Sequence, residues 1–452
     1  MREFITSADL ENLARSGTTQ LVLRPGVVLT EAARETAARV GVRIVDSPAG
    51  APAAESWSKP GGPPAWPRGS LMDESVVAAW REEFPILADA IHVGNCSQGP
   101  QSRHVRRAIE AYLDNWLTVG MDWDYWMAEV SRAKAEFARL IGASPDEIAV
   151  STSVSEAVSS VASALRTANG RRKVVATEAE FPTVGHVWLA HQKYGYKVEF
   201  VPVRDGQLML DDYDRYVDQD TLVASITHVY YLNGFKQDLE PVVRLAHSRG
   251  SLVLVDAYQS LGTCPLDVKA LDIDFLASGN LKYLLGIPGI AFLYVKRDLV
   301  PGLTPAVTGW FGQENPFSFE VRLLDYARDA RRFDTGTPPV MPAFAARAGM
   351  EIVNHLGPKA ISDRVDMLSR VALDACRRHG LKSVSPEDIS RKGPTTAIDV
   401  PGGDSHAVEV ALRARNIIAS ARGPVIRVAP HFFIRPEDIE RVVGEIALIL
   451  RR

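Results

Sequence analysis

The chain has 452 residues, of which 46% are hydrophobic and 23% charged, values typical of a soluble globular protein with a large core and a smaller second domain. Its net charge of −4 gives no indication of a nucleic-acid partner, and no apolar stretch is long enough to predict a membrane partner. Three cysteines are too few for a disulfide framework, and their spacing predicts no metal site.

Residues 1–46 are predicted to form a small α/β module. The N-terminus lacks the basic and apolar segments of a signal peptide, which predicts a cytoplasmic location. A strand and turn at 18–26 precede a helix over 31–40, and a second strand follows at 42–45. Because so short a unit has a marginal core, we expect it to dock onto another protein or to pair with a copy.

Residues 47–70 are rich in proline, glycine and alanine and show no periodicity, which predicts a semi-extended linker. Its two tryptophans, Trp57 and Trp66, are unusual in a pure spacer. They are candidates to anchor the linker to a surface, although chance explains them equally well.

Strand-like and helical stretches alternate beyond the linker, which predicts a parallel or mixed sheet covered by helices on both faces. The strands are nearly continuous in Val, Ile and Leu, as burial on both faces requires. Beyond about Thr337 longer helices with few strands predict a smaller C-terminal domain. The strand-like stretches of the larger part are 147–153, 173–179, 197–203, 222–231, 252–258, 274–279 and 290–295.

The segment from Ser251 to Val295 carries the clearest chemical signal. An apolar run ends in Asp256, and the next strand-like piece leads to Lys282. A carboxylate at the end of one buried strand and a lysine just past the next can face one cavity. This pairing suits pyridoxal phosphate (PLP), since the lysine forms a Schiff base and the carboxylate keeps the pyridine nitrogen protonated. Taken singly, each residue has a plainer explanation as a turn residue or a solvated lysine.

The motifs VDAYQSLG, LDVKALDIDFLASG and LKYLLG-PG resemble the class V aminotransferase superfamily of fold-type I PLP enzymes, which includes cysteine desulfurases, kynureninases and isopenicillin-type epimerases. The resemblance runs from about Asp73 to the C-terminus. It implies a PLP-binding α/β domain over 106–336, with a mixed, mostly parallel seven-stranded sheet sandwiched by helices. A smaller α+β domain over 337–452 would be joined by the segment 71–105. Lys282 would be the catalytic lysine, PLP the cofactor and an α-amino acid the substrate.

The resemblance also implies most of the cofactor contacts. The Val154 amide and Ser155 would bind the PLP phosphate at the start of a helix, which is a ready anion site. Phe181 would stack on the PLP ring, as in kynureninases, and Thr183 would add a hydrogen bond. Gln259 would lie beside the phenolic oxygen, and the Asp256 carboxylate would bind the ring nitrogen.

Three further cofactor contacts are expected from the resemblance: one just before Lys282, where the sequence departs from the family, and two beyond residue 300. The usual histidine before the lysine is Leu281 here, so Ser278 or Asn280 would replace its phosphate contact, and the sequence leaves that choice open. Trp310, in TGWFG, resembles a cofactor-contacting tryptophan of kynureninases. Thr337, in TGTPP, would reach the phosphate of the neighbouring subunit, which implies a homodimer with two composite sites.

The substrate is assigned to Arg427, Tyr231 and Asn95. Arg427 lies in the family's IRV-x-P pattern, and its planar guanidinium suits the α-carboxylate of an amino acid. Tyr231 stands where the family has an asparagine, and it could donate a hydrogen bond or act as an acid–base group instead. Asn95 is the third residue expected at the substrate.

An aminotransferase is the first expectation, and a kynureninase-like hydrolase, a β-lyase or an epimerase remain alternatives. Each begins with proton removal at the substrate Cα, and the sequence does not decide which bond breaks next. No cysteine lies between Val400 and Arg427, where a desulfurase carries its nucleophile. We expect Cys96, Cys264 and Cys376 to be small buried hydrophobic residues, so persulfide chemistry is not expected.

Residues 1–46 suggest a separate role. They resemble N-terminal segments of some bacterial microcompartment enzymes, which implies a docking or targeting element for a scaffold or shell protein and a location within such a compartment. A PLP-fold protein without activity is disfavoured, because Asp256, Lys282 and Arg427 are all present.

Overall fold

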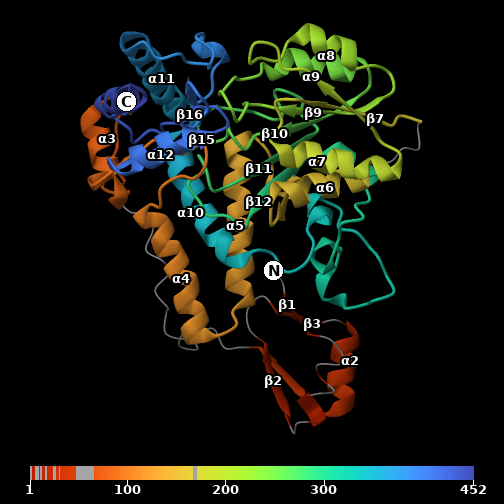
Figure 1. Cartoon of the computed structure of the whole chain (residues 1–452). Coiled ribbons are helices and arrows are strands. Elements are labelled where there is room, and N and C mark those ends of the chain that lie inside the picture. The colour runs from red at the N-terminus through yellow and green to blue at the C-terminus, as the bar shows by residue number, and fades with distance from the viewer. Residues whose placement is uncertain are drawn as a thin grey trace. The chain divides into compact units, whose positions relative to one another are not determined.

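The computed structural model describes residues 3–5, 10, 13–15, 18–23, 27–29, 31–46, 66–165 and 170–451. It divides into two compact units, Met1–Ala65 and Trp66–Arg452 (Figure 1). Most of the predicted linker, including Trp57, lies outside the described residues. Trp66, one of the two candidate anchors, is buried in the larger unit, with its ring centroid 4.8 Å from that of His355 and 5.7 Å from that of Trp80.

The smaller unit pairs its strands in two parallel sets, β1 with β3 and β2 with β4. Ala33 and Ala37 lie one turn apart on α2 and are buried together with Leu10 and Val42. The helix predicted over 31–40 and both predicted strands are present. The elements are β1 (Glu3–Ile5), β2 (Gln20–Leu23), β3 (Val27–Leu29), α2 (Glu31–Val40) and β4 (Arg43–Asp46).

The larger unit contains a seven-stranded sheet with the order β6-β12-β11-β10-β9-β7-β8. Only β12 runs against its neighbours, so the predicted mixed, mostly parallel sheet is confirmed. The strands are β6 (Ile148–Ser151), β7 (Lys173–Thr177), β8 (Lys197–Val201), β9 (Thr221–Thr227), β10 (Leu252–Asp256), β11 (Phe275–Gly279) and β12 (Ala291–Val295).

Helices cover both faces of this sheet (Figure 1). Successive residues of β10 alternate between two cores: Val253 and Val255 pack with residues of α5 and α9, and Leu254 packs with residues of α6 and α7. This explains why the strand is apolar throughout. The helices of this part are α4 (Arg103–Val119), α5 (Trp123–Ile141), α6 (Val154–Ala164), α7 (Pro182–His191), α8 (Leu210–Tyr216), α9 (Leu239–Ser248) and α10 (Val340–Leu356).

The C-terminal part combines a three-stranded antiparallel sheet, β13-β16-β15, with three helices. β14 pairs in parallel with β5, which brings the segment before α4 to the C-terminal part. The elements are β5 (Ile91–His92), α11 (Pro358–His379), β13 (Thr396–Asp399), α12 (Ser405–Arg413), β14 (Ile417–Ile418), β15 (Ser420–Arg422), β16 (Val425–Val428) and α13 (Pro436–Leu450).

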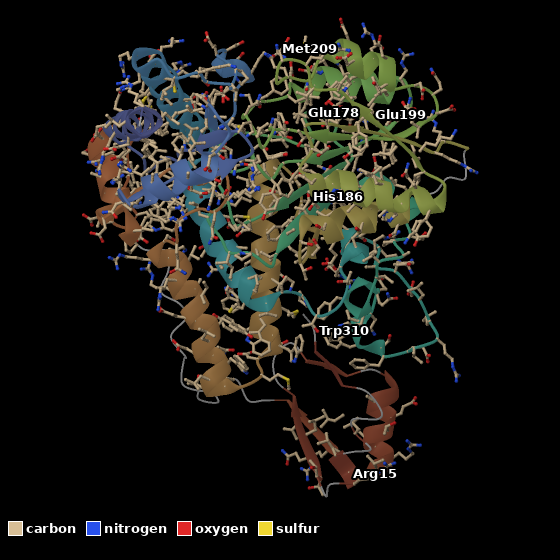
Figure 2. All side chains as sticks on the ribbon, in the orientation of Figure 1. Arg15, Glu178, His186, Glu199, Met209 and Trp310 are labelled. Atoms are coloured by element: carbon tan, nitrogen blue, oxygen red, sulfur yellow. The ribbon has the colours of Figure 1, made fainter. Side chains whose placement is uncertain are left out.

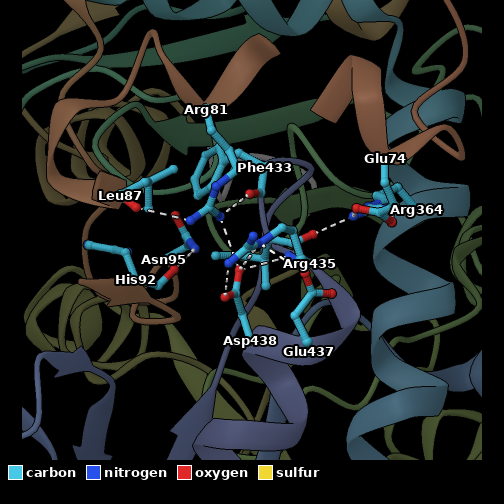
Figure 3. A network of polar contacts seen from close by, with 11 residues as sticks. Glu74, Arg81, Leu87, His92, Asn95, Arg364, Phe433, Arg435, Glu437 and Asp438 are labelled. Carbon is cyan, nitrogen blue, oxygen red and sulfur yellow. Dashed lines mark hydrogen bonds and ion pairs between the residues drawn. The ribbon is translucent and has the colours of Figure 1, made fainter. Parts of the chain in front are cut away.

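A polar network ties α3 (Glu74–Arg81) to α11 and α13 (Figure 3). The fully buried Arg364 of α11 forms an ion pair with Glu74, Nη2 to Oε2 at 3.0 Å, and donates to the Ile434 carbonyl at 2.6 Å. Arg81 pairs with Asp438 of α13 at 3.1 Å. Because a buried guanidinium is costly without partners, these contacts fix the N-terminal segment against the C-terminal helices.

No helix within the described ranges is long and apolar enough to cross a membrane. The same residues include no group of three or more His, Cys, Asp or Glu side chains that could hold a metal ion.

Candidate active site

Most of the predicted site residues lie around one edge of the seven-stranded sheet. β6, β7, β9, β10 and β11 run in the same direction, so their carboxyl ends share that edge, where open α/β sheets bind ligands. Asp256 ends β10, and Lys282 follows β11. Val154 begins α6 just beyond β6. Phe181 and Tyr231 follow β7 and β9.

Lys282 and Asp256 form the electrostatic centre of this edge. Burial lowers the pKa of Lys282 to about 8, and the negative charge of Asp256 opposes that shift. Burial raises the pKa of Asp256, while a hydrogen bond from the Tyr258 amide, at 2.9 Å, and the charge of Lys282 oppose the rise. The acid at the end of β10 and the amine in the loop after the neighbouring β11 therefore act on each other.

Aromatic rings surround the amine. Lys282 Nζ lies 4.1 Å from the centroid of the Tyr258 ring and 5.6 Å from that of Phe181. Phe181 meets Tyr231 edge to face, with centroids 5.3 Å apart. Pro182 opens α7 directly after Phe181, and its fixed φ favours a helix start there, which leaves Phe181 at the helix end with Thr183 in the first turn.

Arg427 is 1% exposed and held by three hydrogen bonds. Its Nη1 donates to the Tyr231 carbonyl at 2.8 Å, and its Nη2 donates to Ser420 Oγ at 2.6 Å and to Ser97 Oγ at 3.0 Å. Ser420 is its ladder partner on β15. The guanidinium is thus fixed in position by neutral partners, which leaves its positive charge available for an anion.

Asn95 and Gln259 are buried on the side of the C-terminal part. The Asn95 amide donates to the Ala429 carbonyl at 2.8 Å and to the His92 carbonyl at 3.5 Å. Figure 3 shows Asn95 beside His92. Gln259 Nε2 donates to the Cys96 carbonyl at 3.1 Å. Backbone carbonyls therefore orient the amide nitrogen of each side chain, while its oxygen has no partner in the described structure.

Several buried polar atoms around this edge lack a hydrogen-bond partner among the described residues. Buried polar atoms are normally paired, so such a group indicates a place for a polar ligand. Ser278 differs, because its hydroxyl donates to the Gly279 carbonyl at 3.0 Å. Together with the Asp256 carboxylate, the Lys282 amine and the aromatic rings, the unpartnered atoms fit a phosphorylated pyridine. The unpartnered atoms are Asn95 Oδ1, Glu180 Oε2, His228 Nδ1, Gln259 Oε1, Asn280 Oδ1 and Nδ2, and Arg427 Nε.

The N-terminus of α6 provides a further feature that fits the phosphate. Ser153 caps the helix by accepting from the Glu156 amide at 3.2 Å. The first amides of a helix, here those of Val154 and Ser155, have no acceptor within the helix and attract anions. Val154 is buried and Ser155 is partly buried.

Residues 105–430 match the family described as Aminotransferase class-V. The chain belongs to this family. A relative named as the uncharacterized aminotransferase YcbU of Bacillus subtilis (strain 168) is 38% identical over 374 residues, which cover 83% of this chain and 98% of the relative. The kynureninase of Pseudomonas fluorescens is 27% identical over 399 residues, covering 83% of this chain and 94% of that enzyme.

Solved structures share the fold of this class-V enzyme. A cysteine desulfurase from Thermococcus onnurineus NA1 has a TM-score of 0.75 at 22% identity, covering 82% of this chain and 97% of that one. A C-DES mutant with glycine covalently linked to its PLP cofactor has a TM-score of 0.74 at 18% identity, covering 81% and 98%. The predicted superfamily, fold, enzymatic nature and PLP cofactor are confirmed.

Two predicted cofactor residues of the class-V enzyme are not brought to Lys282 within one chain. Trp310 instead packs in an aromatic cluster, with its centroid 6.2 Å from both Trp123 and Phe319. Figure 2 shows Trp310 well separated from Glu178 and His186, which flank the segment of Phe181. Thr337 is exposed just before α10. Within the described part of the chain, neither side chain contacts Lys282.

The loop over 281–286, which carries Lys282, is enclosed by three glycines. A Cβ on Gly99, Gly262 or Gly349 would lie 2.6, 2.3 or 2.3 Å from a backbone oxygen of this loop. The Gly99 amide also donates to the first carbonyl of the loop at 2.8 Å. Backbone therefore packs on backbone around the lysine, which restricts where its side chain begins.

Two residues that carried no role in the sequence analysis lie at the site. Tyr258 contacts the Lys282 amine through its ring. Glu180 is buried, accepts from Ser225 Oγ at 3.4 Å, and has its pKa raised well above the usual range by burial and by the charge of Asp256. The only signal in the sequence was proximity, since Tyr258 lies two residues after Asp256 and Glu180 directly precedes the FPT triplet.

Proposed function

We propose that this class-V enzyme is an aminotransferase for an α-amino acid, with Lys282 as its catalytic lysine. The observation that carries the proposal is geometric: Asp256 ends β10, Lys282 follows the paired strand β11, and the Lys282 amine lies 5.6 Å from the centroid of the Phe181 ring. A relative named as an aminotransferase, 38% identical over 83% of this chain, supports transamination over the alternatives.

PLP, when bound, supplies an electron sink for charge at the substrate Cα. Lys282 would bind it covalently and later move the Cα proton, a role suited to an amine with a pKa of about 8. The Asp256 carboxylate would hold the ring nitrogen, and the Phe181 ring would stack on the cofactor. Arg427 would bind the α-carboxylate of the substrate. Its present partners, two serine hydroxyls and a backbone carbonyl, are neutral, so the positive charge of the guanidinium stays uncompensated until the substrate binds.

The phosphate would be held by the amides of Val154 and Ser155 together with Asn280. Asn280 is favoured over Ser278 because both its side-chain polar atoms lack partners, whereas the Ser278 hydroxyl is already bonded. Asn280→Ala is therefore expected to raise the Kd for PLP more than Ser278→Ala. The converse order would assign the contact to Ser278.

Near the rest of the cofactor, Gln259 would lie beside the phenolic oxygen and Thr183 would add a hydrogen bond. Tyr231 and Asn95 would line the substrate side, where the Tyr231 carbonyl and the Ala429 carbonyl already orient Arg427 and Asn95.

A kynureninase-like hydrolase is the second candidate. It is supported by Phe181 beside Lys282, in an FPT triplet, and by kynureninases among the relatives. A desulfurase is disfavoured because all three cysteines are buried and unpaired and none lies between Val400 and Arg427.

Purified holoenzyme assayed with a panel of amino acids, with and without 2-oxo acids, separates these candidates. Amino transfer that requires the 2-oxo acid is the expected result. Release of alanine and anthranilate from kynurenine without a 2-oxo acid would replace the proposal with the hydrolase. Lys282→Ala should lose covalent PLP in either case, whereas retention of covalent PLP by this variant would remove the basis of both.

We also propose a homodimer in which Trp310 and Thr337 act at the partner's site. Exposed apolar side chains on α4 and on the segment 317–324 support a contact with a second copy. They are Leu113, Trp116, Leu117, Val119, Phe317, Phe319, Val321, Leu323 and Leu324. Sedimentation should give a dimer, and mixing inactive Lys282→Ala with inactive Thr337→Ala should restore up to about a quarter of the activity through mixed dimers. A monomer, or no restoration, would contradict the composite site.

For the N-terminal module we propose a docking or targeting role toward a scaffold or shell protein. Deletion of residues 1–65 should leave PLP binding and turnover intact, since the larger unit begins at Trp66. Deletion of residues 1–70 should lower stability, because it removes the buried Trp66. A reporter fused to residues 1–65 should co-purify with shell or scaffold particles, and a reporter that stays free would contradict the role.

A further inference from the structure

The Tyr258 ring lies next to the Lys282 amine, the reacting group of the proposed enzyme. Its amide donates to Asp256 at 2.9 Å, which fixes the turn after β10. From that turn its ring reaches the Lys282 amine, with 4.1 Å between Nζ and the ring centroid. An ammonium over an aromatic face at this distance is attracted by the ring's negative face. The corresponding distance to Phe181 is 5.6 Å, so Tyr258 is the nearer of the two rings.

Gly279 makes this ring position sterically accessible. A Cβ built on Gly279 would lie 2.0 Å from Tyr258 Cε2, 2.1 Å from Cζ and 2.3 Å from Oη. All three nearest atoms belong to the same ring, so the absence of a side chain at residue 279 creates the space that Tyr258 fills. The ring is therefore seated between the end of β11 and the amine three residues further along the chain.

We propose that Tyr258 is a positioning residue whose ring holds the Lys282 amine and favours its protonated form. The proposal rests on the assignment of Lys282 as the PLP-binding lysine. Other groups also act on the amine: Asp256 and Cys96 favour its charged form, and Arg427 and Arg422 disfavour it. None of these is altered by a change at residue 258, so the contribution of the ring can be measured against a constant background.

The test uses the full-length protein stripped of PLP and the matched pair Tyr258→Phe and Tyr258→Leu. PLP is added across a range of pH, the adduct is trapped by borohydride, and the label on Lys282 is quantified by peptide mass spectrometry. Since the neutral amine reacts, loss of the ring in Tyr258→Leu should lower the pH midpoint by roughly half to one pH unit. That shift makes labelling well below the midpoint about three- to tenfold faster. Tyr258→Phe keeps the ring and should keep the midpoint.

Gly279→Ala supplies an independent perturbation of the same contact. The added methyl displaces the ring, so this variant should shift the midpoint in the same direction as Tyr258→Leu. The double variant Gly279→Ala/Tyr258→Leu should shift it no further, because the ring that the methyl displaces is gone. Thermal unfolding of each variant checks that it is folded.

The outcomes separate the proposal from the assignment beneath it. An unchanged pH midpoint in folded Tyr258→Leu would overturn the positioning role of the ring. A shift in Tyr258→Phe as large as that in Tyr258→Leu would also overturn it, because the effect would then belong to the hydroxyl. If Lys282→Ala were labelled as strongly as the wild type, at another lysine, the assignment of Lys282 itself would fail. The midpoint shift and its absence in Tyr258→Phe together would support the ring contact.

Discussion

Gly349→Ala tests directly whether backbone packing holds the lysine loop in place. A Cβ at Gly349, inside α10, would lie 2.3 Å from the Leu284 carbonyl oxygen, 2.9 Å from the Leu285 carbonyl carbon and 3.0 Å from the Gly286 nitrogen. In an open helix position the change from glycine to alanine stabilises by about 1 kcal/mol. Overpacking costs about 1–3 kcal/mol, and these are backbone atoms that cannot rotate away. The expected net effect is a loss of up to about 2 kcal/mol and a displaced Lys282.

Gly444 in α13 is the matched control for this prediction. Its added Cβ would lie 3.7 Å from the nearest atom, on His379, which is an ordinary contact. Thermal unfolding with and without PLP, and the Kd for PLP by ultrafiltration, are measured for both variants. Gly349→Ala should unfold at a lower temperature and bind PLP more weakly, whereas Gly444→Ala should unfold at the same or a higher temperature. If both variants gained stability and bound PLP equally, the packing argument would be refuted.

Three further changes probe the charges of the site. In the PLP-free protein, labelling of Lys282 by PLP should have its pH midpoint near 8, and Asp256→Asn should lower that midpoint because it removes the charge that favours the ammonium. Arg427→Lys keeps the charge but cannot reproduce three hydrogen bonds, so kcat/KM should fall by about a hundredfold while the PLP spectrum stays unchanged. Glu180→Gln should leave the unfolding temperature in mildly acidic buffer nearly unchanged, because the raised pKa of Glu180 keeps that acid protonated there; a large drop would show that it is ionised.

The fold could be predicted because local patterns and burial agree along the larger unit. The run Leu252–Val255 reads as a strand buried on both faces, and its side chains do enter two different cores. In the smaller unit, the end of the helix over 31–40 is predicted by the turn residue Gly41, which takes a positive φ of 72°. Strand order could not be derived from periodicity, since β12 pairs not only with β11, which precedes it in the chain, but also with β6, which lies far from it in the sequence.

The site was predictable where residues end strands and unpredictable where side chains meet across elements. Asp256 and Lys282 follow neighbouring strands, so topology alone brings them to one edge. The contact of Tyr258 with Lys282 depends on the missing side chain of Gly279, a relation between two separate strand ends. A glycine in a strand can mark a bulge, a bend or a close approach of another group, and the sequence alone does not distinguish these.

The acid and the amine at the centre of the site depend on each other, and this leads to a final prediction. Burial raises the pKa of Asp256, and the charge of Lys282 limits that rise. Lys282→Met removes this limit, so the pKa of Asp256 should rise further. A carboxyl whose folded pKa lies above its unfolded value of 3.8 is stabilising when protonated, and that stabilisation is lost as pH rises through the folded pKa. The PLP-free Lys282→Met protein should therefore lose more stability than the wild type as the buffer is taken from acidic to neutral, with Asp256→Asn/Lys282→Met as the control that removes the effect. Equal slopes for the wild type and Lys282→Met, measured by denaturant unfolding across this range, would mean that the two groups titrate independently.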